Sequence, residues 1–230
     1  LQAKRKHADN TDLMVEINRI VSESLALEPT SEGLMESKRF DISKIDFDLL
    51  HREFAKAANQ GLIIKDLSEL VEERLKQMLR SNPARIDYYE RYQNIIEQYN
   101  AEKDRSEIER IFDELTKLAQ DLSQEEKRYV REGFSSDEEL SVFDLLFKED
   151  LNKKEIEMIK KVAVDLLAKV KAKISELDHW TDKTETKAII DNLIRDTLWA
   201  ELPESYDELS VSAYRQEIYQ YIYMRYKDVA

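Results

Sequence analysis

The chain has 230 residues, of which 42% are hydrophobic and 37% are charged, and its formal net charge is −13. This composition is too apolar for a disordered chain, while 3 glycines and 3 prolines are too few for a fold with many tight turns. The negative charge argues against tight non-specific nucleic-acid binding over the whole surface, and the absence of cysteine excludes disulfides and thiolate metal sites. Long amphipathic helices fit these limits best.

Three helices are predicted before the turn at Pro83. Apolar residues recur at spacings of three and four in residues 12–27, and the same pattern returns in residues 40–61 and 63–82, which separate near Gly61. A residue before proline avoids helical backbone angles, so Asn82, which precedes Pro83, is the predicted end of the third helix. We therefore interpret residues 1–230 as one helical domain with a possible division near residues 81–84, into 1–82 and 83–230.

The middle of the chain continues the helical pattern. Residues 85–100 and 106–122 are both predicted to be amphipathic helices. Ser123 with Glu126, and Ser136 with Glu139, each place a serine three residues before a glutamate, which is typical of a capping box. These two pairs predict two further helix starts, with Gly133 between the helices.

A two-faced helix is predicted from Asn152 onward, roughly 35 Å long at the rise of an α-helix. Its apolar face carries Ile156, Ile159, Ala163, Leu166, Leu167, Val170 and Ile174. A lysine stripe lies on another face and consists of Lys153, Lys154, Lys160, Lys161 and Lys171. We interpret the stripe as a solvated face, with contact to DNA or to an acidic partner as the alternative.

The segment HWTDKTETKAIIDNLIRDTLWAELPESYDE, residues 179–208, places a helix between the two tryptophans, Trp180 and Trp199. Asp182 and Glu185 resemble a capping pair, and Pro203 prevents the helix from continuing. A last helix, rich in tyrosine, is predicted in residues 210–226. The helix between the two tryptophans is expected to bury one face, which is formed by Ile189, Ile190, Leu193, Ile194 and Leu198. No alternating strand pattern is longer than a few residues, so we predict an all-α, multi-helix bundle.

Catalytic motifs were sought and not found. The sequence contains no Walker loop, no GxGxxG, no GxSxG and no cysteine nucleophile, so we expect no catalytic and no cofactor-binding residue in this chain. It also has no secretory signal and no apolar run of about 18 residues, which favours a cytoplasmic protein without a membrane partner. Because the chain opens on Leu1 and a basic LQAKRKH segment, we expect it to be a piece of a longer protein.

One metal site had to be considered. Helical bundles can hold two iron ions through Glu-x-x-His pairs, and Glu176 with His179 has this spacing. The one possible second pair, Asp48 with His51, replaces glutamate with a shorter carboxylate. We therefore predict no metal site and interpret these residues as solvated helix ends.

Tyrosine and arginine alternate in ARIDYYERYQ and YRQEIYQYIYMRY, a pattern that can stack nucleic-acid bases. Tyrosine at helical spacing with Ile and Met between is more often part of a core, and we favour that interpretation. Tryptophan is typical of a core or of an interface anchor.

Four stretches, taken together and in order, resemble a known family. They are SNPARIDYYERYQNIIEQYN, YVREGFSSDEELSVFDLLF, LNKKEIEMIKKVAVDLLAKVKAKI and residues 179–208, followed by the tyrosine-rich end. They are similar to the C-terminal part of the R subunit of bacterial type I restriction enzymes, from about residue 64 to residue 226, whereas residues 1–60 match only loosely.

The resemblance implies a role in assembly. In that family the R subunit is an ATP-dependent motor and endonuclease, with a nuclease domain and two RecA-like domains before a helical C-terminal region. ATP and Mg²⁺ would belong to the parent enzyme, and the partners would be the methyltransferase (M) and specificity (S) subunits, with DNA bound by the whole complex. The region is implicated in docking the motor onto that core, and our candidate contact residues are Trp199, Tyr206, Tyr214 and Tyr221.

Overall fold

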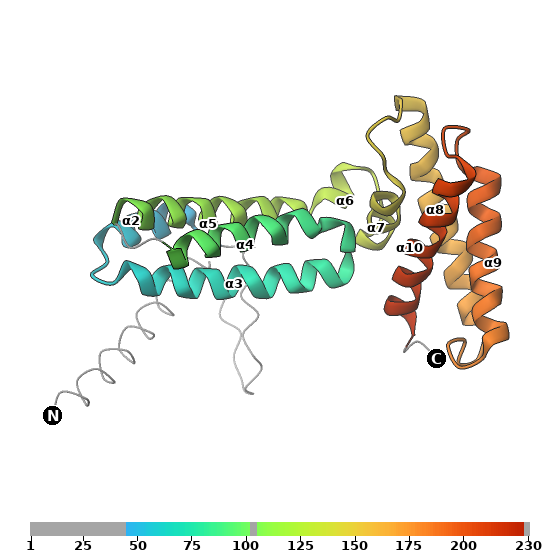
Figure 1. Ribbon diagram of the computed structural model, residues 1–230, viewed down its shortest axis with the longest axis horizontal. Coiled ribbons are helices and arrows are strands. Elements are labelled where there is room, and N and C mark those ends of the chain that lie inside the picture. Colours follow the sequence, from blue (N-terminus) through green and yellow to red (C-terminus); the bar gives the residue numbers. More distant parts are fainter. Residues whose placement is uncertain (1–44, 102–104, 228–230) are drawn as a thin grey trace. The chain divides into compact units, whose positions relative to one another are not determined.

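The computed structural model describes residues 45–101 and 105–227. In this part of the chain there are nine α-helices, one 3-10 helix and no strand, so the all-α prediction is confirmed (Figure 1). None of the described helices is long and apolar enough to cross a membrane. The helix predicted in residues 12–27 lies outside the described residues.

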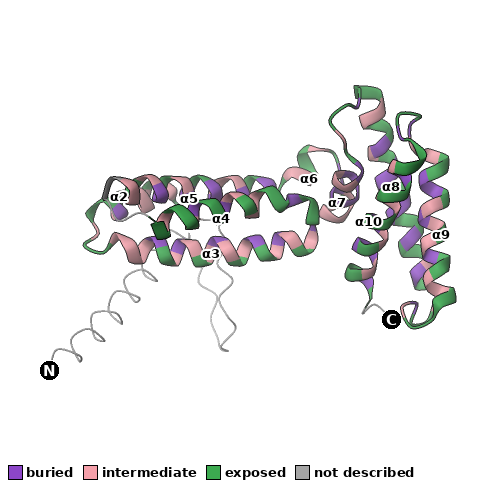
Figure 2. Ribbon diagram, in the orientation of Figure 1, coloured by how far each residue is buried: buried purple, intermediate pink, exposed green. Residues whose placement is uncertain are grey.

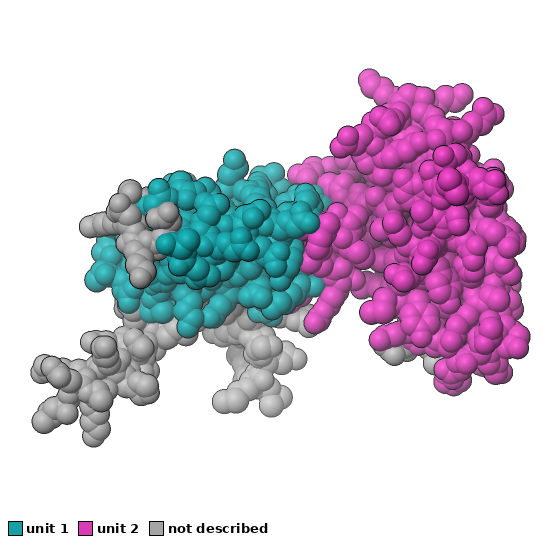
Figure 3. All heavy atoms as spheres, viewed as in Figure 1, with its two compact units in different colours: residues 1–76, 87–125 teal, residues 77–86, 126–230 magenta. Residues whose placement is uncertain are grey.

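The chain divides into two compact units (Figure 3). Unit 1 comprises residues 1–76 and 87–125, and unit 2 comprises residues 77–86 and 126–230. The predicted division near residues 81–84 stays a prediction.

Unit 1 contains α2 (Phe47–Lys56), most of α3 (Gln60–Ser81), α4 (Ile86–Ala101) and α5 (Arg105–Glu125). Helices α3 and α4 run antiparallel, since the Tyr92 hydroxyl donates to the Ser68 carbonyl at 3.2 Å and the Tyr99 hydroxyl to that of Gly61 at 3.4 Å. Phe54 of α2 stacks on Phe112 of α5, with ring centroids 3.7 Å apart. The Arg91 guanidinium of α4 donates to the Asp121 carboxylate of α5 at 2.6 Å, so that aromatic contacts and hydrogen bonds join all four helices.

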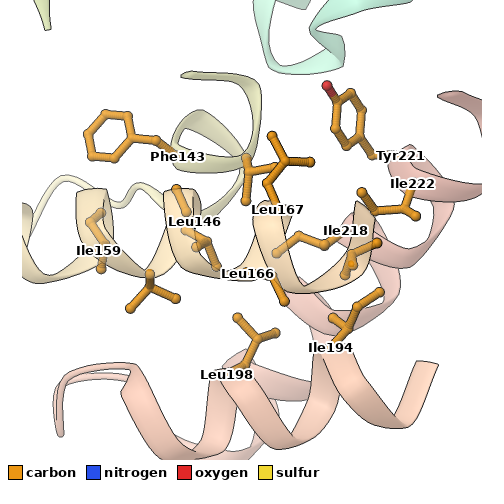
Figure 4. Close-up of a cluster of buried hydrophobic side chains, with 14 of the residues drawn as sticks. Phe143, Leu146, Ile159, Leu166, Leu167, Ile194, Leu198, Ile218, Tyr221 and Ile222 are labelled. Atoms are coloured by element: carbon orange, nitrogen blue, oxygen red, sulfur yellow. The ribbon is translucent and has the colours of Figure 1, made fainter. Parts of the chain in front are cut away.

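Unit 2 contains the 3-10 helix η2 (Pro83–Arg85), α6 (Arg128–Arg131), α7 (Asp137–Leu146), α8 (Lys153–Ser175), α9 (Thr184–Glu201) and α10 (Glu208–Tyr226). Helix α8 packs against α7 and α9, and α10 packs against α9 and α7. The core is formed by side chains from all four of these helices, as Figure 4 shows for Phe143, Leu166, Leu198 and Ile218. Figure 2 shows buried and exposed residues alternating along each helix, as amphipathic helices require.

Two of the predicted helix starts are confirmed by capping hydrogen bonds. The Ser136 side chain accepts from the Glu139 N–H at 3.3 Å, while the Glu139 carboxylate accepts from the N–H of Ser135 at 2.7 Å. Asn152 and Glu155 form a complete capping box at the start of α8. Helix α3 ends at Ser81, and the Asn82 side chain caps η2, so the predicted end near Pro83 is also confirmed.

Other local predictions were wrong. Ser123 lies in the last turn of α5 and starts no helix, because α6 begins only at Arg128. Near Gly61, by contrast, the two helices separate as predicted, with the break at residues 57–59. Helix α9 has Lys183 at its N-cap with no side-chain capping bond, so the Asp182–Glu185 pair does not start it. Ile189 is exposed, in contrast to the other predicted apolar positions of α9.

Candidate functional site

The two tryptophans occupy opposite environments in unit 2. Trp180 is buried, donates from its indole N–H to the Tyr226 carbonyl at 3.0 Å, and meets the ring of Tyr223 edge-on. Trp199, near the end of α9, is 53% exposed. The first is therefore a core anchor, while the second leaves half of a large aromatic surface open to solvent.

The three candidate tyrosines are less exposed to solvent than Trp199. Tyr206, between α9 and α10, is buried and its hydroxyl donates to the Leu146 carbonyl at 2.5 Å, while Lys148 Nζ lies 4.6 Å from its ring centroid. Tyr221 of α10 is buried, and Tyr214 is half-buried with its ring centroid 5.5 Å from that of Tyr206. A direct contact with a partner is thus open to Trp199 and Tyr214, whereas Tyr206 and Tyr221 pack inside the unit.

Burial controls the ionisation of these phenols. It raises the pKa of Tyr206 far above its ordinary value and raises that of Tyr221 to about 12. Both hydroxyls are therefore protonated at neutral pH. The Tyr221 hydroxyl has no partner in hydrogen-bonding geometry within the described residues, although the nearby Ser141 hydroxyl, which donates to the Ser81 and Asp137 carbonyls, lowers its pKa slightly against the effect of burial. In Figure 4 the Tyr221 hydroxyl points away from the aliphatic side chains of the cluster.

A groove of about 1000 Å³ lies beside α10, and all the residues that line it belong to unit 2. We call it the α10 groove. Its lining comes from the end of α3 and η2, which we call the η2 wall, from the end of α7 with Phe147 after it, and from α10, which we call the α10 wall. Its apolar lining includes Leu79, Pro83, Leu145, Phe147, Tyr214 and Met224, and its charged lining includes Arg80, Asp144, Glu217, Arg225 and Lys227.

Buried polar contacts hold the η2 wall against α7. The Asn82 amide donates to the Asp144 carboxylate at 2.6 Å, and the buried Arg85 guanidinium pairs with Asp137 at 2.8 Å. Ser141 donates its hydroxyl to the Ser81 carbonyl at 2.9 Å. Burial raises the pKa of Asp144 despite its ion pair with Arg128. The η2 wall and the end of α7 are therefore fixed to each other.

The lysine stripe is only partly free. Lys160 Nζ contacts both the carbonyl and the carboxylate of Glu132 at 3.1 Å, and Lys171 pairs with Glu138. Lys153, Lys154 and Lys161 are exposed and make no ion pair with any residue that the structure describes. The part of the stripe available to a ligand is thus reduced to these three lysines near the start of α8.

The residues considered for a metal belong to different units. Glu176 and His179 follow α8 in unit 2, whereas Asp48 and His51 belong to α2 in unit 1. The Glu176 carboxylate accepts from Lys173 at 2.6 Å, and His51 Nδ1 lies 3.5 Å from Asp113. Among residues 45–101 and 105–227, no group of three or more His, Asp or Glu side chains could hold a metal ion.

Sequence reasoning missed the α10 groove and the contacts that fix its wall. Asn82 was interpreted only as a helix end, although its amide also reaches Asp144, 62 residues away. Phe147 was not singled out at all. The sequence signal was weak: a phenylalanine directly after α7 and a methionine in the last turn of α10.

The chain was compared with known proteins. A family model described as the C-terminal region of type I restriction enzyme HindI endonuclease subunit-like proteins matches residues 1–220. No curated protein and no solved structure gives a significant match.

Proposed function

The chain belongs to the family of C-terminal regions of HindI-like type I restriction enzyme endonuclease subunits, and from this membership we propose that it is an assembly domain that docks the subunit onto the methyltransferase core. The observation that carries the proposal is the exposure of Trp199. Tryptophan is enriched among the residues that contribute most to binding at protein interfaces, so an exposed tryptophan is a candidate anchor for a partner.

The neighbourhood of Trp199 supports an interface. Ile189 is 43% exposed and lies ten residues earlier on α9, so that both side chains fall on the side of the helix away from the buried Ile190 and Ile194. Asp196 is exposed between them. This face combines apolar anchors with charge, as interface cores and rims do.

A binding experiment tests the proposal. The chain is mixed with its cognate methyltransferase core and passed over a sizing column, and the dissociation constant is then measured by titration. We expect co-elution, and we expect Trp199→Ala to weaken binding at least tenfold. Val130→Ala, which shortens another exposed apolar side chain of unit 2, is the matched control and should bind as the wild type does. A folded wild-type chain that does not co-elute contradicts the proposal.

The wider setting is also a proposal. The resemblance to the R subunit supports an ATP-dependent DNA translocase as the parent enzyme, with ATP and Mg²⁺ bound outside this chain. It likewise supports the M and S subunits as partners and the cytoplasm as the location.

DNA contact through the lysine stripe is the second candidate. The exposure of Lys153, Lys154 and Lys161 favours it, while Glu157 and Asp165 on the same side of α8 oppose it. A gel shift at low salt tests it: the wild-type chain should retard a DNA duplex, and the three Lys→Glu changes together should abolish the shift. Absence of any wild-type shift at low salt rules out this role.

A further inference from the structure

The α10 groove has an apolar interior that the chain itself leaves uncovered. Met224 is 67% exposed and Phe147 is 42% exposed, and both line the groove together with Leu79, Pro83 and Tyr214. Methionine adapts its shape to a partner at low cost, which makes it frequent in grooves that receive helices. The groove thus offers an apolar strip, formed by these five side chains, between the η2 wall and the α10 wall.

The sum of the unpaired charges around this strip is opposite in sign to the net charge of the chain. Arg80 is exposed and makes no ion pair within the described residues, and the same holds for Lys227. Of the other groove charges, Glu217 has no ion pair in the part of the chain that the structure describes, while Asp144 pairs with Arg128 and Arg225 with Glu138. The unpaired charge of the groove is therefore positive, although the chain carries −13. Such a local reversal favours an acidic occupant and fixes where it can bind.

The length of the groove limits the shape of the occupant. The α10 wall extends from Tyr214 to Lys227, which is about 20 Å at the rise of an α-helix. A partner helix of three to four turns has this length, and its apolar positions at i, i+3, i+4 and i+7 would fill a strip of this kind. Because hydrogen bonds already fix η2 to α7, little ordering is needed when the helix binds.

We propose that the α10 groove binds an amphipathic helix of the methyltransferase core, with an apolar stripe against Met224 and Phe147 and with carboxylates beside Arg80 and Lys227. This inference rests on the proposed docking function and specifies the partner's chemistry at a surface separate from Trp199. The helix of the partner buries the apolar strip, and its carboxylates neutralise the two unpaired cations.

The test measures the dissociation constant of the chain and its cognate methyltransferase core by titration. Met224→Asp places a charge in the apolar strip and should weaken binding at least tenfold. Val130→Asp is the matched control, because Val130 is 61% exposed on α6 and does not line the groove. Arg80→Glu with Lys227→Glu should also weaken binding at least tenfold and should flatten its salt dependence, whereas Lys154→Glu with Lys161→Glu should leave both within twofold of the wild type.

Each outcome decides between the two proposals. All of these side chains are exposed, so circular dichroism and thermal melting should show an unchanged fold for each variant. If the wild type binds and Met224→Asp binds within twofold of it, the groove proposal is overturned while the docking function stands. If the wild type does not bind the core, both fail. If Met224→Asp instead abolishes a concentration-dependent dimer, the occupant is a second copy of the chain, which also overturns the proposal.

Discussion

Two buried tyrosines of unit 2 illustrate how the same residue type can have different energetic roles. Tyr206 donates its hydroxyl to the Leu146 carbonyl, which satisfies a polar group inside the unit. Tyr221 is equally buried, but its hydroxyl makes no hydrogen bond within the described residues. A hydrogen bond contributes about 1 kcal/mol net, while a buried polar group without a partner destabilises the fold by about 1–3 kcal/mol.

Replacing each tyrosine with phenylalanine separates these two cases. Tyr206→Phe should lower the free energy of unfolding by about 1 kcal/mol, because the bond to Leu146 is lost. Tyr221→Phe should leave the free energy of unfolding unchanged or raise it, because only an unsatisfied hydroxyl is removed. Urea unfolding followed by tryptophan fluorescence measures both. An equal loss for the two variants would show that the Tyr221 hydroxyl is hydrogen-bonded after all.

At the scale of the element, α8 is the helix whose start is most strongly specified. The Asn152 side chain accepts from the N–H groups of Lys154 and Glu155 at 3.0 and 3.1 Å, and the Glu155 carboxylate accepts from the Asn152 N–H at 2.9 Å. That backbone hydrogen bond lowers the pKa of Glu155. Helix α9 starts by other means, since the Thr186 hydroxyl in its first turn donates back to the carbonyl of the buried Trp180 at 2.7 Å.

Asn152→Ala should therefore lower the free energy of unfolding of unit 2 by about 1 kcal/mol, because two N–H groups of the first turn lose their acceptor. Asn192→Ala is the control: Asn192 is exposed in the middle of α9, where alanine is the better helix former. It should leave the free energy of unfolding the same or slightly higher. Similar losses for both variants would mean that the cap contributes nothing of its own.

At the scale of the whole molecule, the chain has two cores, and both of its tryptophans belong to unit 2. Fluorescence therefore reports the unfolding of unit 2, while circular dichroism reports the helices of both units. The core of unit 1 depends strongly on Phe112, which is fully buried and stacked on Phe54.

Phe112→Ala should destabilise unit 1 by about 3–5 kcal/mol, through lost burial and a cavity. In urea, the helical signal should then fall at a lower concentration, in two steps, while the midpoint of tryptophan fluorescence stays where it is in the wild type. If both signals shift together by the same amount, the chain unfolds as one cooperative block and the two cores are not independent.

The sequence by itself determined the helical class and the long helices of the chain, because both depend on interactions within a few residues. The period of Ile159, Ala163, Leu166 and Val170 specifies the buried face of α8, and the Asn152 cap specifies its start. The four stretches that resemble the R subunit, in the same order along the chain, also identified the family correctly.

Only the tertiary structure decided which aromatic side chains are accessible. Trp199, in the last turn of α9, is exposed while Trp180, just before the same helix, is buried. Ile189 is exposed although it shares the helical period of its neighbours. These outcomes depend on which helices pack together, and helical periodicity does not encode that. The α10 groove has the same origin: its walls come from segments more than 100 residues apart, and contacts such as Asn82 with Asp144 hold one of them in place.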